Sequence, residues 1–336
     1  MNTGSDRRTV PRSGLAVKPA CFVSPPRDTS ERMKLLSDFD GVWTHPREEG
    51  IAQGVLLDEL LLLSSPASER EATRAWIVTA RRAVLAEPSL YGWAPGGRLS
   101  CFADEDPFAK HSALLHYLHL KSAADPVAAR LVQAVLASGH GSLEDFGGWC
   151  HRASVRILQL ARGPAILATA AQAGLDMLQG GIDVVVVSNS GTQKLVDWFG
   201  PTAVPTVVDD PAHPAPPATM RLRGNALKFV LDETQRSPLT AGSVTVETAR
   251  PHYEKVIRAE LEGYAGPAAV VGDLFSIDLA LPLRLRRTEA AFAGLRLFWI
   301  VRDYTPARLQ REIAAHVPEV EAVSGLEEVA ARLLRG

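Results

Sequence analysis

The stretch that decides the fold is "MKLLSDFDGVWTHP", residues 33–46. It joins a short apolar run to two carboxylates, Asp38 and Asp40, which are followed by Gly41. Two acids this close repel each other, and the repulsion destabilises the fold unless a nearby group uses the charge. A metal ion, a phosphoryl group or a proton transfer would each use it. The stretch therefore indicates a charged site directly after a buried strand.

The composition is that of an ordinary globular protein. The chain has 336 residues, of which 46% are apolar and 22% charged, so we expect one large domain or two moderate ones. A formal net charge of −2 gives no reason to expect nucleic acid or an acidic membrane as a partner. Three cysteines far apart do not form a disulfide framework. These features favour a cytoplasmic protein with no membrane partner, and they leave the oligomeric state open.

The chain begins with a segment unlike the rest. Residues 1–32 are rich in Arg, Ser, Pro and Thr and show no sustained periodicity. Such a segment buries too little apolar surface to offset the entropy of ordering it. We therefore expect a disordered tail that ends where the first strand begins.

Short apolar runs predict a parallel sheet. Three of the runs are followed by helical patterns, and alternating strands and helices are typical of a parallel sheet covered on both faces. The fold class expected is therefore α/β, a Rossmann-like parallel sheet with helices on both faces. The expected strands are 34–37, 184–187, 203–208, 268–271 and 297–301, and the expected helices are 192–199, 277–285 and 306–315.

The long gap after the first strand predicts a second, smaller domain. Residues 48–164 show no convincing strand and several helical patterns, such as Ala72, Trp76, Ala80 and Val84 at intervals of four. Further helices are expected at 108–121, 125–138 and 143–160. We therefore expect an inserted, mostly helical cap over 48–164 and an α/β core made of 33–47 and 165–336. Within that core, "MRLRGNALKFVLD" (220–232) suggests a hairpin that turns at Gly224-Asn225.

Polar side chains gather where the strands end. The first strand leads into "SDFDGVWT", the second into "SNSGT" and the fourth into "GDLFSID". In an open parallel sheet, ligands bind beyond the carboxyl ends of the strands. Acids and small polar residues from separate segments are therefore expected to surround one charged ligand.

These segments resemble the motifs of the haloacid dehalogenase (HAD) superfamily, in its phosphatase branch with a helical cap. Asp38, Asp40, Gly41 and Thr44 match the first motif, Asp-x-Asp-Gly-x-x-Thr, and Ser188 matches the second. The fourth motif, Gly-Asp followed by another Asp, is matched by Gly272, Asp273 and Asp278. The resemblance covers about residues 34–44 and 165–305. It implies a HAD-like phosphohydrolase, that is, a phosphoric monoester hydrolase.

The third motif departs from the family pattern, which has Lys-Pro a little over twenty residues before the metal-binding Asp. Here Arg250-Pro251 lies 23 residues before Asp273. Arginine supplies the positive charge and contacts phosphate through two nitrogens. Lys255, one to two helical turns further on, is the alternative, and Lys194 is a third choice. The sequence leaves open which of them neutralises the phosphate.

The resemblance implies a role for each matched residue. Asp38 is the expected nucleophile, and Asp40 the expected acid and base. Mg²⁺ is the implied cofactor, held by the carboxylates of Asp38 and Asp273, the main-chain carbonyl of Asp40, and Asp278 directly or through water. The transferring oxygens are expected to contact Ser188, the Asn189 main-chain NH, and Arg250 or Lys255, and Gly41 lets the backbone turn sharply between them.

A carboxylate at position 40 favours phosphatases and phosphomutases, because dehalogenases and transporting ATPases of the family differ there. The leading hypothesis is a Mg²⁺-dependent phosphatase of a small phosphorylated metabolite. A phosphomutase, or a non-catalytic binding protein of the same fold, is the alternative. Two local interpretations also stay open. Asp278 is either a metal-site residue or a helix N-cap, and "YGWAPGGRLSCFADEDPF" (91–108) is either a specificity loop or a surface loop.

Overall fold

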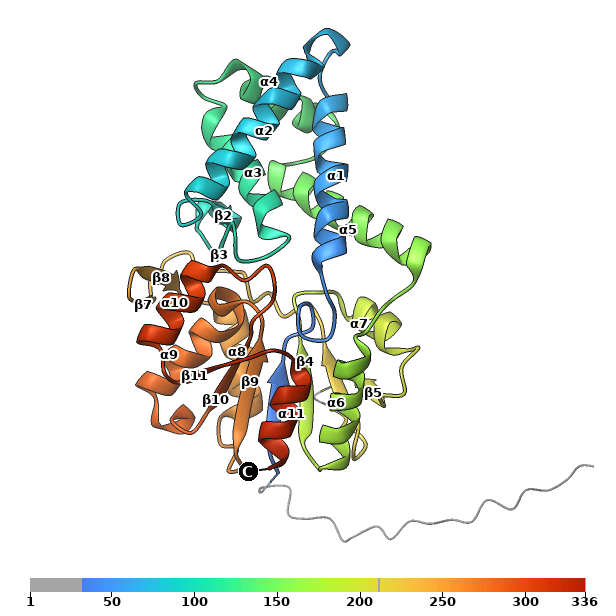
Figure 1. Ribbon diagram of the computed structural model, residues 1–336, viewed down its shortest axis with the longest axis vertical. Coiled ribbons are helices and arrows are strands. Elements are labelled where there is room, and N and C mark those ends of the chain that lie inside the picture. Colours follow the sequence, from blue (N-terminus) through green and yellow to red (C-terminus); the bar gives the residue numbers. More distant parts are fainter. Residues whose placement is uncertain (1–31, 211, 336) are drawn as a thin grey trace, which may run out of the picture.

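A computed structural model describes residues 32–210 and 212–335. Apart from residue 32, the tail expected to be disordered over 1–32 lies outside the described residues. The central feature is a seven-stranded sheet in the order β11-β10-β9-β1-β4-β6-β5, with every pair of neighbours parallel (Figure 1). Its strands are β1 (Lys34–Ser37), β4 (Asp183–Val187), β5 (Thr206–Val208), β6 (Met220–Arg223), β9 (Ala268–Gly272), β10 (Arg296–Ile300) and β11 (Val320–Val323). The predicted Rossmann-like α/β sheet is thus confirmed.

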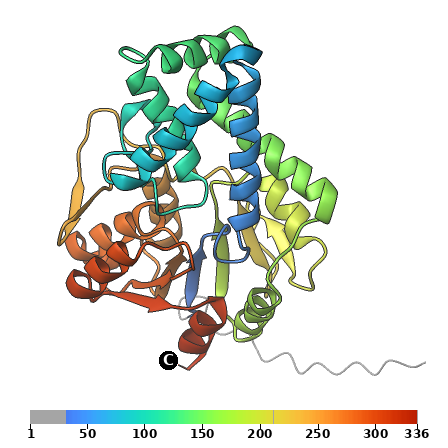
Figure 2. The ribbon, with the colours of Figure 1, turned by 45° about the horizontal axis from the view of Figure 1, so that its top comes forward.

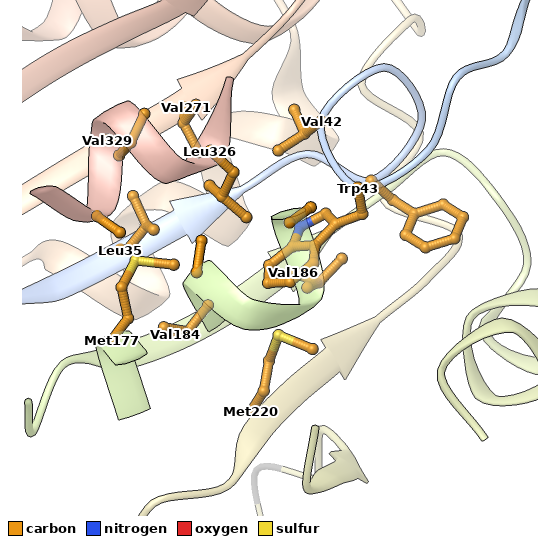
Figure 3. Packing of buried hydrophobic residues seen from close by; sticks show 14 of the residues in the cluster. Leu35, Val42, Trp43, Met177, Val184, Val186, Met220, Val271, Leu326 and Val329 are labelled. Carbon is orange, nitrogen blue, oxygen red and sulfur yellow. The ribbon is translucent and has the colours of Figure 1, made fainter. Parts of the chain in front are cut away.

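Alternating side chains of the central strands supply two cores, one on each face of the sheet. Leu35 of β1 faces the first core, which includes Trp43 and side chains of α6 (Ala168–Gln179), α7 (Thr192–Phe199) and α11 (Leu326–Leu334) (Figure 3). Leu36 faces the second core, which includes side chains of α8 (Pro251–Leu261), α9 (Ala280–Thr288) and α10 (Ala307–His316). Helices therefore cover both faces, as predicted.

Five helices form a bundle above the carboxyl ends of the strands (Figures 1 and 2). They are α1 (Arg47–Leu63), α2 (Arg70–Ala86), α3 (Ala109–Lys121), α4 (Pro126–Ala137) and α5 (Leu143–Arg162). The bundle has a hydrophobic core of its own, to which Leu57, Leu114 and Leu131 belong. It also carries a small hairpin, β2 (Gly92–Trp93) and β3 (Cys101–Phe102), which the sequence did not indicate. The boundaries expected for a cap and a core stay predictions.

The hairpin expected over 220–232 is wrong. Residues 220–223 form β6, which lies parallel between β4 and β5, and no strand follows directly. The reason is a set of longer-range hydrogen bonds. The backbone NH of Asn225 donates to Ser190 O, and that of Ala226 donates to Ser188 O, both at 2.9 Å. The antiparallel pair in this part of the chain is instead β7 (Pro238–Ala241) with β8 (Val244–Glu247).

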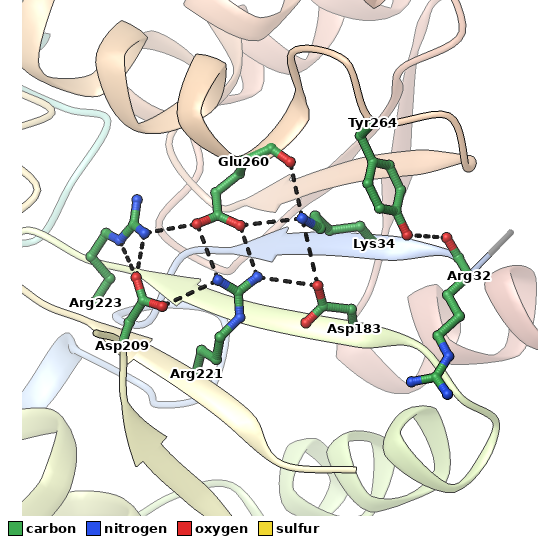
Figure 4. Close-up of polar contacts among 8 residues, drawn as sticks. All are labelled: Arg32, Lys34, Asp183, Asp209, Arg221, Arg223, Glu260 and Tyr264. Atoms are coloured by element: carbon green, nitrogen blue, oxygen red, sulfur yellow. Dashed lines mark hydrogen bonds and ion pairs between the residues drawn. The ribbon is translucent and has the colours of Figure 1, made fainter. Parts of the chain in front are cut away.

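An ion-pair network joins helix α8 to the sheet (Figure 4). The Glu260 carboxylate of α8 accepts from Arg221 at 2.8 Å and from Arg223 at 2.7 Å, both on β6. Lys34 of β1 lies 3.3 Å from the same carboxylate and 3.6 Å from Asp183. Because every member has an opposite charge beside it, the network fixes the C-terminal end of α8 against the strands.

Within 32–210 and 212–335, no helix combines the length and the apolar character needed to cross a bilayer.

Candidate active site

The loop after β1 places two carboxylates at the edge of the sheet. Phe39, Val42 and Trp43 are buried in the core, so the side chains of Asp38 and Asp40, on either side of Phe39, face the edge of the sheet. The loop is tight because the NH groups of Val42 and Trp43 both donate to Phe39 O, at 3.2 and 2.9 Å. Such a turn uses the positive φ of Gly41, +80°. The alternation of apolar and acidic residues thus fixes the loop and presents its charges.

The acids after β9 meet Asp38 at this edge. Oxygen atoms of Asp38, Asp273 and Asp278 all lie within 4.8 Å of one another. Asp278 sits on a π-helical turn, Phe275–Leu279, and folds back over Gly272, where a Cβ atom would lie 2.3 Å from the Asp278 Cβ. The NH of Leu274 donates to Asp278 Oδ2 at 3.1 Å. Asp278 is therefore not the N-cap of α9, whose N-cap residue is Leu279.

Asp273 is held on one side only. The Tyr304 hydroxyl donates to Asp273 Oδ2 at 2.6 Å, whereas the buried Asp273 Oδ1 has no hydrogen-bond partner among the described residues. Gly41 packs directly against this carboxylate, because a Cβ atom there would lie 2.1 Å from Asp273 Oδ2. A buried carboxylate oxygen without a partner is costly unless a cation or a donor joins it.

Burial and mutual repulsion disfavour negative charge on this cluster. Burial, and then the charge of Asp278, raise the pKa of Asp38 to about 8, although Lys228 opposes them. Burial, followed by the charges of Asp278 and Asp38, also raises the pKa of Asp273 well above its usual range. Asp38 and Asp273 therefore require added positive charge nearby in order to be carboxylates at neutral pH.

Lys228, which the sequence interpretation missed, supplies one positive charge. Its Nζ lies 2.5 Å from Asp38 Oδ1 and 2.6 Å from Asp278 Oδ1, and its side chain is only 2% exposed. Burial alone lowers the pKa of Lys228, but the charges of Asp278 and Asp38 outweigh it and raise that pKa above its ordinary value. The lysine reaches this place because its own NH donates to Asn189 Oδ1 at 2.7 Å.

Neither Arg250 nor Lys255 contacts the carboxylates of Asp38, Asp273 and Asp278. The structure therefore does not place either residue where the sequence predicted the phosphate-neutralising cation. The buried Arg250 guanidinium donates to neutral oxygens, at 2.7 to 3.0 Å. These acceptors are Ser100 O and Oγ, Lys228 O and Ser276 O. Lys255 is exposed on α8 and lines a surface groove with Glu254 and Arg258. Arg250 therefore supports the Lys228 main chain instead of facing the acids.

Asp40 has partners on both of its oxygens. The Ser190 hydroxyl donates to Asp40 Oδ2 at 2.7 Å, and Lys194 Nζ donates to Asp40 Oδ1 at 2.9 Å. Although burial raises the pKa of Asp40, the Lys194 charge and these hydrogen bonds outweigh burial and lower that pKa. Lys194, the third choice for the phosphate cation, thus pairs with Asp40. In the free protein Asp40 is an ionised carboxylate.

Ser188 and Asn189 follow β4 at the same edge of the sheet. Ser37 of β1 lies opposite Val186 of β4, so the residues after both strands emerge side by side. Ser188 is buried, and its Oγ accepts from the Ser190 NH at 3.0 Å. The segment that was expected to bind the transferring oxygens thus adjoins the one that carries Asp38.

The bundle contributes buried acids to the same region through the segment 91–108. Glu105 accepts from the Ser276 NH at 2.8 Å and from the Ser276 hydroxyl at 2.6 Å. Asp106 accepts from the Phe108 NH, and burial raises the pKa of Asp106 to about 7, with a smaller contribution from Asp40. The interpretation of 91–108 as an ordinary surface loop is therefore wrong. A role in specificity stays a prediction.

Comparisons with known proteins find only distant likeness. No protein-family model matches the chain, and no curated protein matches it. Solved structures that resemble it include two dehalogenases. One, titled as a crystal structure analysis of a dehalogenase, is 12% identical, with a TM-score of 0.38 over 92% of this chain and 100% of that one. The other is a 2-haloacid dehalogenase from Pseudomonas syringae pv. Tomato DC3000. It is 15% identical, with a TM-score of 0.36 over 91% of this chain and 99% of that one.

Likenesses this weak carry no conclusion about what the chain does.

The chemistry of the three carboxylates itself suits a divalent cation. Asp38, Asp273 and Asp278 offer hard oxygen ligands, as Mg²⁺ prefers. One of these oxygens, Asp273 Oδ1, is buried without a partner in the described part of the chain, and Lys228 balances only one of the three negative charges. The residues present therefore fit such an ion.

Proposed function

We propose that this chain is a HAD-like, Mg²⁺-dependent phosphatase that hydrolyses a small phosphomonoester through an aspartyl-phosphate at Asp38. The observation that carries the proposal is the position of Asp38. Its carboxylate lies against the Lys228 ammonium at 2.5 Å and within 4.8 Å of two further carboxylates. Attack on an anionic ester requires an anionic nucleophile beside positive charge, which Lys228 supplies and which the two further carboxylates would supplement by holding a cation.

The proposed cation site consists of Asp38, Asp273 and Asp278, together with the main-chain carbonyl of Asp40. Mg²⁺ bound there supplies positive charge that lets the nucleophile and the phosphoryl group approach each other. The Lys228 side chain supplies a second positive charge, which is present whether or not the metal ion is bound. The Tyr304 hydroxyl keeps the Asp273 carboxylate in one orientation.

As the ester binds in its monoanionic form, Asp40 takes up the proton of the ester. In the first step an Asp38 oxygen attacks phosphorus, and the bond between phosphorus and the leaving oxygen breaks as that oxygen receives this proton from Asp40. In the second step water attacks the same phosphorus, Asp40 accepts a proton from the water, and the bond to Asp38 breaks. Inorganic phosphate leaves, Asp40 loses its proton to the departing phosphate, and both carboxylates are restored. The ionised state of Asp40 in the free protein suits the second step directly.

Ser188 and the main-chain NH of Asn189 are the proposed contacts for the non-bridging oxygens of the phosphoryl group. The helical bundle over the strand ends is the proposed cap, which shields the site from bulk water. Both similar structures are titled dehalogenases, but the Asp40 carboxylate and the cation-binding acids favour phosphoryl transfer here.

The test is a screen of phosphorylated metabolites with the full chain, in which phosphate release is measured with Mg²⁺ and again with EDTA. We expect Mg²⁺-dependent release for at least one small ester, and a loss of about 10³-fold or more in Asp38→Asn. Stoichiometric release of phosphate separates hydrolysis from a phosphomutase reaction. A wild-type protein inert toward every ester, or an unchanged rate in Asp38→Asn, would overturn the proposal.

A further inference from the structure

Three charged residues connect the helical bundle to Asp40. Lys194 of α7 lies between two carboxylates, with its Nζ 2.9 Å from Asp40 Oδ1 and 3.1 Å from Glu49 Oε2. Glu49 belongs to the first turn of α1, so it reaches the contact from the bundle, whereas Asp40 and Lys194 reach it from the sheet side. The side chains of Lys194 and Glu49 are only 12% and 8% exposed. A chain of two partly buried ion pairs thus crosses from the bundle to the loop after β1.

The lysine is itself held in place. Its ammonium lies 5.7 Å from the centre of the Phe39 ring and 5.1 Å from that of the Trp198 ring. Aromatic faces attract a cation at such distances, and the contact limits the freedom of a long side chain. Lys194 therefore has a fixed position, and a fixed cation orients the carboxylate that it binds.

Asp40 has little freedom left once these contacts form. Ser190 holds its Oδ2 at 2.7 Å and Lys194 holds its Oδ1, so the plane of the carboxylate is fixed from both sides. Proton transfer needs a donor and an acceptor aligned within hydrogen-bond reach, and a misplacement of about 1 Å can cost about 100-fold in rate. The orientation of Asp40 is thus as important as its presence.

We propose that Lys194 is a positioning residue for Asp40 and that Glu49 holds Lys194 there, so that seating the helical bundle on the sheet orders the acid-base carboxylate. The inference rests on the proposed function, in which Asp40 transfers the proton. It adds a physical link between closure of the bundle and that transfer. Displacement of α1 would remove the Glu49 contact and leave Lys194 bound to Asp40 alone.

The test compares two esters that differ in the leaving group. Phenyl phosphate releases a basic phenolate, which needs a proton, whereas p-nitrophenyl phosphate releases a weakly basic one that needs little help. We expect Lys194→Met to lower kcat for phenyl phosphate by about 100-fold and for p-nitrophenyl phosphate by less than about 10-fold, with little change in KM. Lys194→Arg keeps the charge and should recover part of the loss.

The bundle side of the contact has a matched control. Glu49→Gln should lower kcat for phenyl phosphate by about 3- to 10-fold, because Lys194 loses its second partner but keeps Asp40. Glu48→Gln should leave both rates unchanged, since Glu48 is the neighbouring glutamate, is 66% exposed and pairs with Arg162. Equal effects of the two substitutions would overturn the role of Glu49.

Hydrogen exchange supplies a readout that does not depend on catalysis. Amides of residues 50–53 are the first of α1 with a helical hydrogen bond, beginning with that of Gly50 to Pro46 O at 2.9 Å, and they should exchange several-fold faster in Lys194→Met and in Glu49→Gln than in the wild type. An unchanged ratio of the two kcat values in Lys194→Met overturns the positioning role, and unchanged exchange overturns the link to the bundle. A wild type that releases no phosphate from any ester overturns the proposed function instead, and the exchange experiment still decides the link.

Discussion

Lys228 Nζ lies 2.5 Å from Asp38 Oδ1, although the two residues are 190 positions apart in the sequence. The contact is buried, and the same ammonium also binds Asp278 at 2.6 Å. It joins the ends of three strands, because Asp38 follows β1, Lys228 follows β6 and Asp278 follows β9. Lys228 is thus the cation nearest to the proposed nucleophile among the described residues.

The first prediction concerns this lysine. Lys228→Met leaves Asp38 and Asp278 without their shared partner, so we expect phosphatase activity to fall by about 100- to 1000-fold. Breaking a buried ion pair costs about 3–5 kcal/mol of the free energy of unfolding, part of which protonation of the acids will recover. Lys255→Met is the matched control, since Lys255 is exposed on α8 and should change neither quantity measurably. Equal losses in the two variants, measured by kinetics and urea unfolding, would contradict the assignment.

The sequence locates most of this site but not its lysine. Apolar runs predict β1 and β9, and the carboxyl ends of neighbouring parallel strands meet at one edge of a sheet, so Asp38 and Asp273 are expected to lie close together. That rule requires only that strands be recognised. It needs no knowledge of loops, which is why it finds the acids.

Lys228 depends on a loop that the apolar pattern does not describe. Asn225 and Leu227, at φ of +56° and +49°, turn the chain after β6, and the backbone then bonds to residues 188–190. Residues other than glycine seldom adopt a positive φ, so the sequence gives no reason to expect such a turn at Leu227. The Gly224-Asn225 pair favours a hairpin instead. Arg250 misleads for a related reason. Its distance from Asp273 along the chain matches the family motif, but its guanidinium is bound to carbonyl and hydroxyl oxygens.

A second prediction concerns the contact between Gly41 and Asp273. Gly41→Ala adds a Cβ atom that would lie 2.1 Å from Asp273 Oδ2, at a φ of +80°. Gly97→Ala is the matched control, because Gly97 has a φ of +77° but nothing within 4 Å of the added atom. The control should cost about 1 kcal/mol, from backbone conformation alone. We expect Gly41→Ala to lower the free energy of unfolding, measured in urea, by about 2 kcal/mol more than the control does, and to weaken Mg²⁺ binding. Equal losses in the two variants would show that the Asp273 carboxylate can move aside without cost.

A third prediction tests the orientation of Asp273, a proposed ligand of the cation. Tyr304→Phe removes the hydroxyl that donates to Asp273 Oδ2 at 2.6 Å, so Asp273 can rotate away from the cluster. We expect the affinity for Mg²⁺, measured by calorimetric titration, to fall by about 10- to 100-fold. His45→Ala removes the ring that packs edge-on against Tyr304 and lies 3.5 Å from Asp303, but no contact to Asp273, and it should leave the affinity within about 2-fold. An unchanged affinity in Tyr304→Phe would mean that Asp273 does not need this partner.

The last prediction concerns pH. Buried acids with raised pKa values bind protons more tightly in the folded protein than in the unfolded chain, so their ionisation opposes folding. Burial raises the pKa of Asp38 to about 8 and that of Asp106 to about 7, both from a reference value of 3.8. Their contribution to stability is complete at low pH and is lost as pH rises through 7 and 8. Two histidines act in the opposite direction, since desolvation lowers the pKa of His151 to about 4 and that of His111 to about 3. Their effect ends near pH 6.5, the ordinary pKa of histidine.

The window from pH 6.5 to 8.5 therefore isolates the acids. With EDTA present, we expect the free energy of unfolding to fall across this window, by at most about 1.4 kcal/mol per pH unit for each proton released. Mg²⁺ requires the ionised carboxylates, so the stabilisation that it gives should grow over the same window. In Asp38→Asn the fall should become shallower, because one titrating group is gone. Urea unfolding at four pH values, with Mg²⁺ and with EDTA, measures all three effects, and a free energy in EDTA that rises with pH would contradict the burial of these charges.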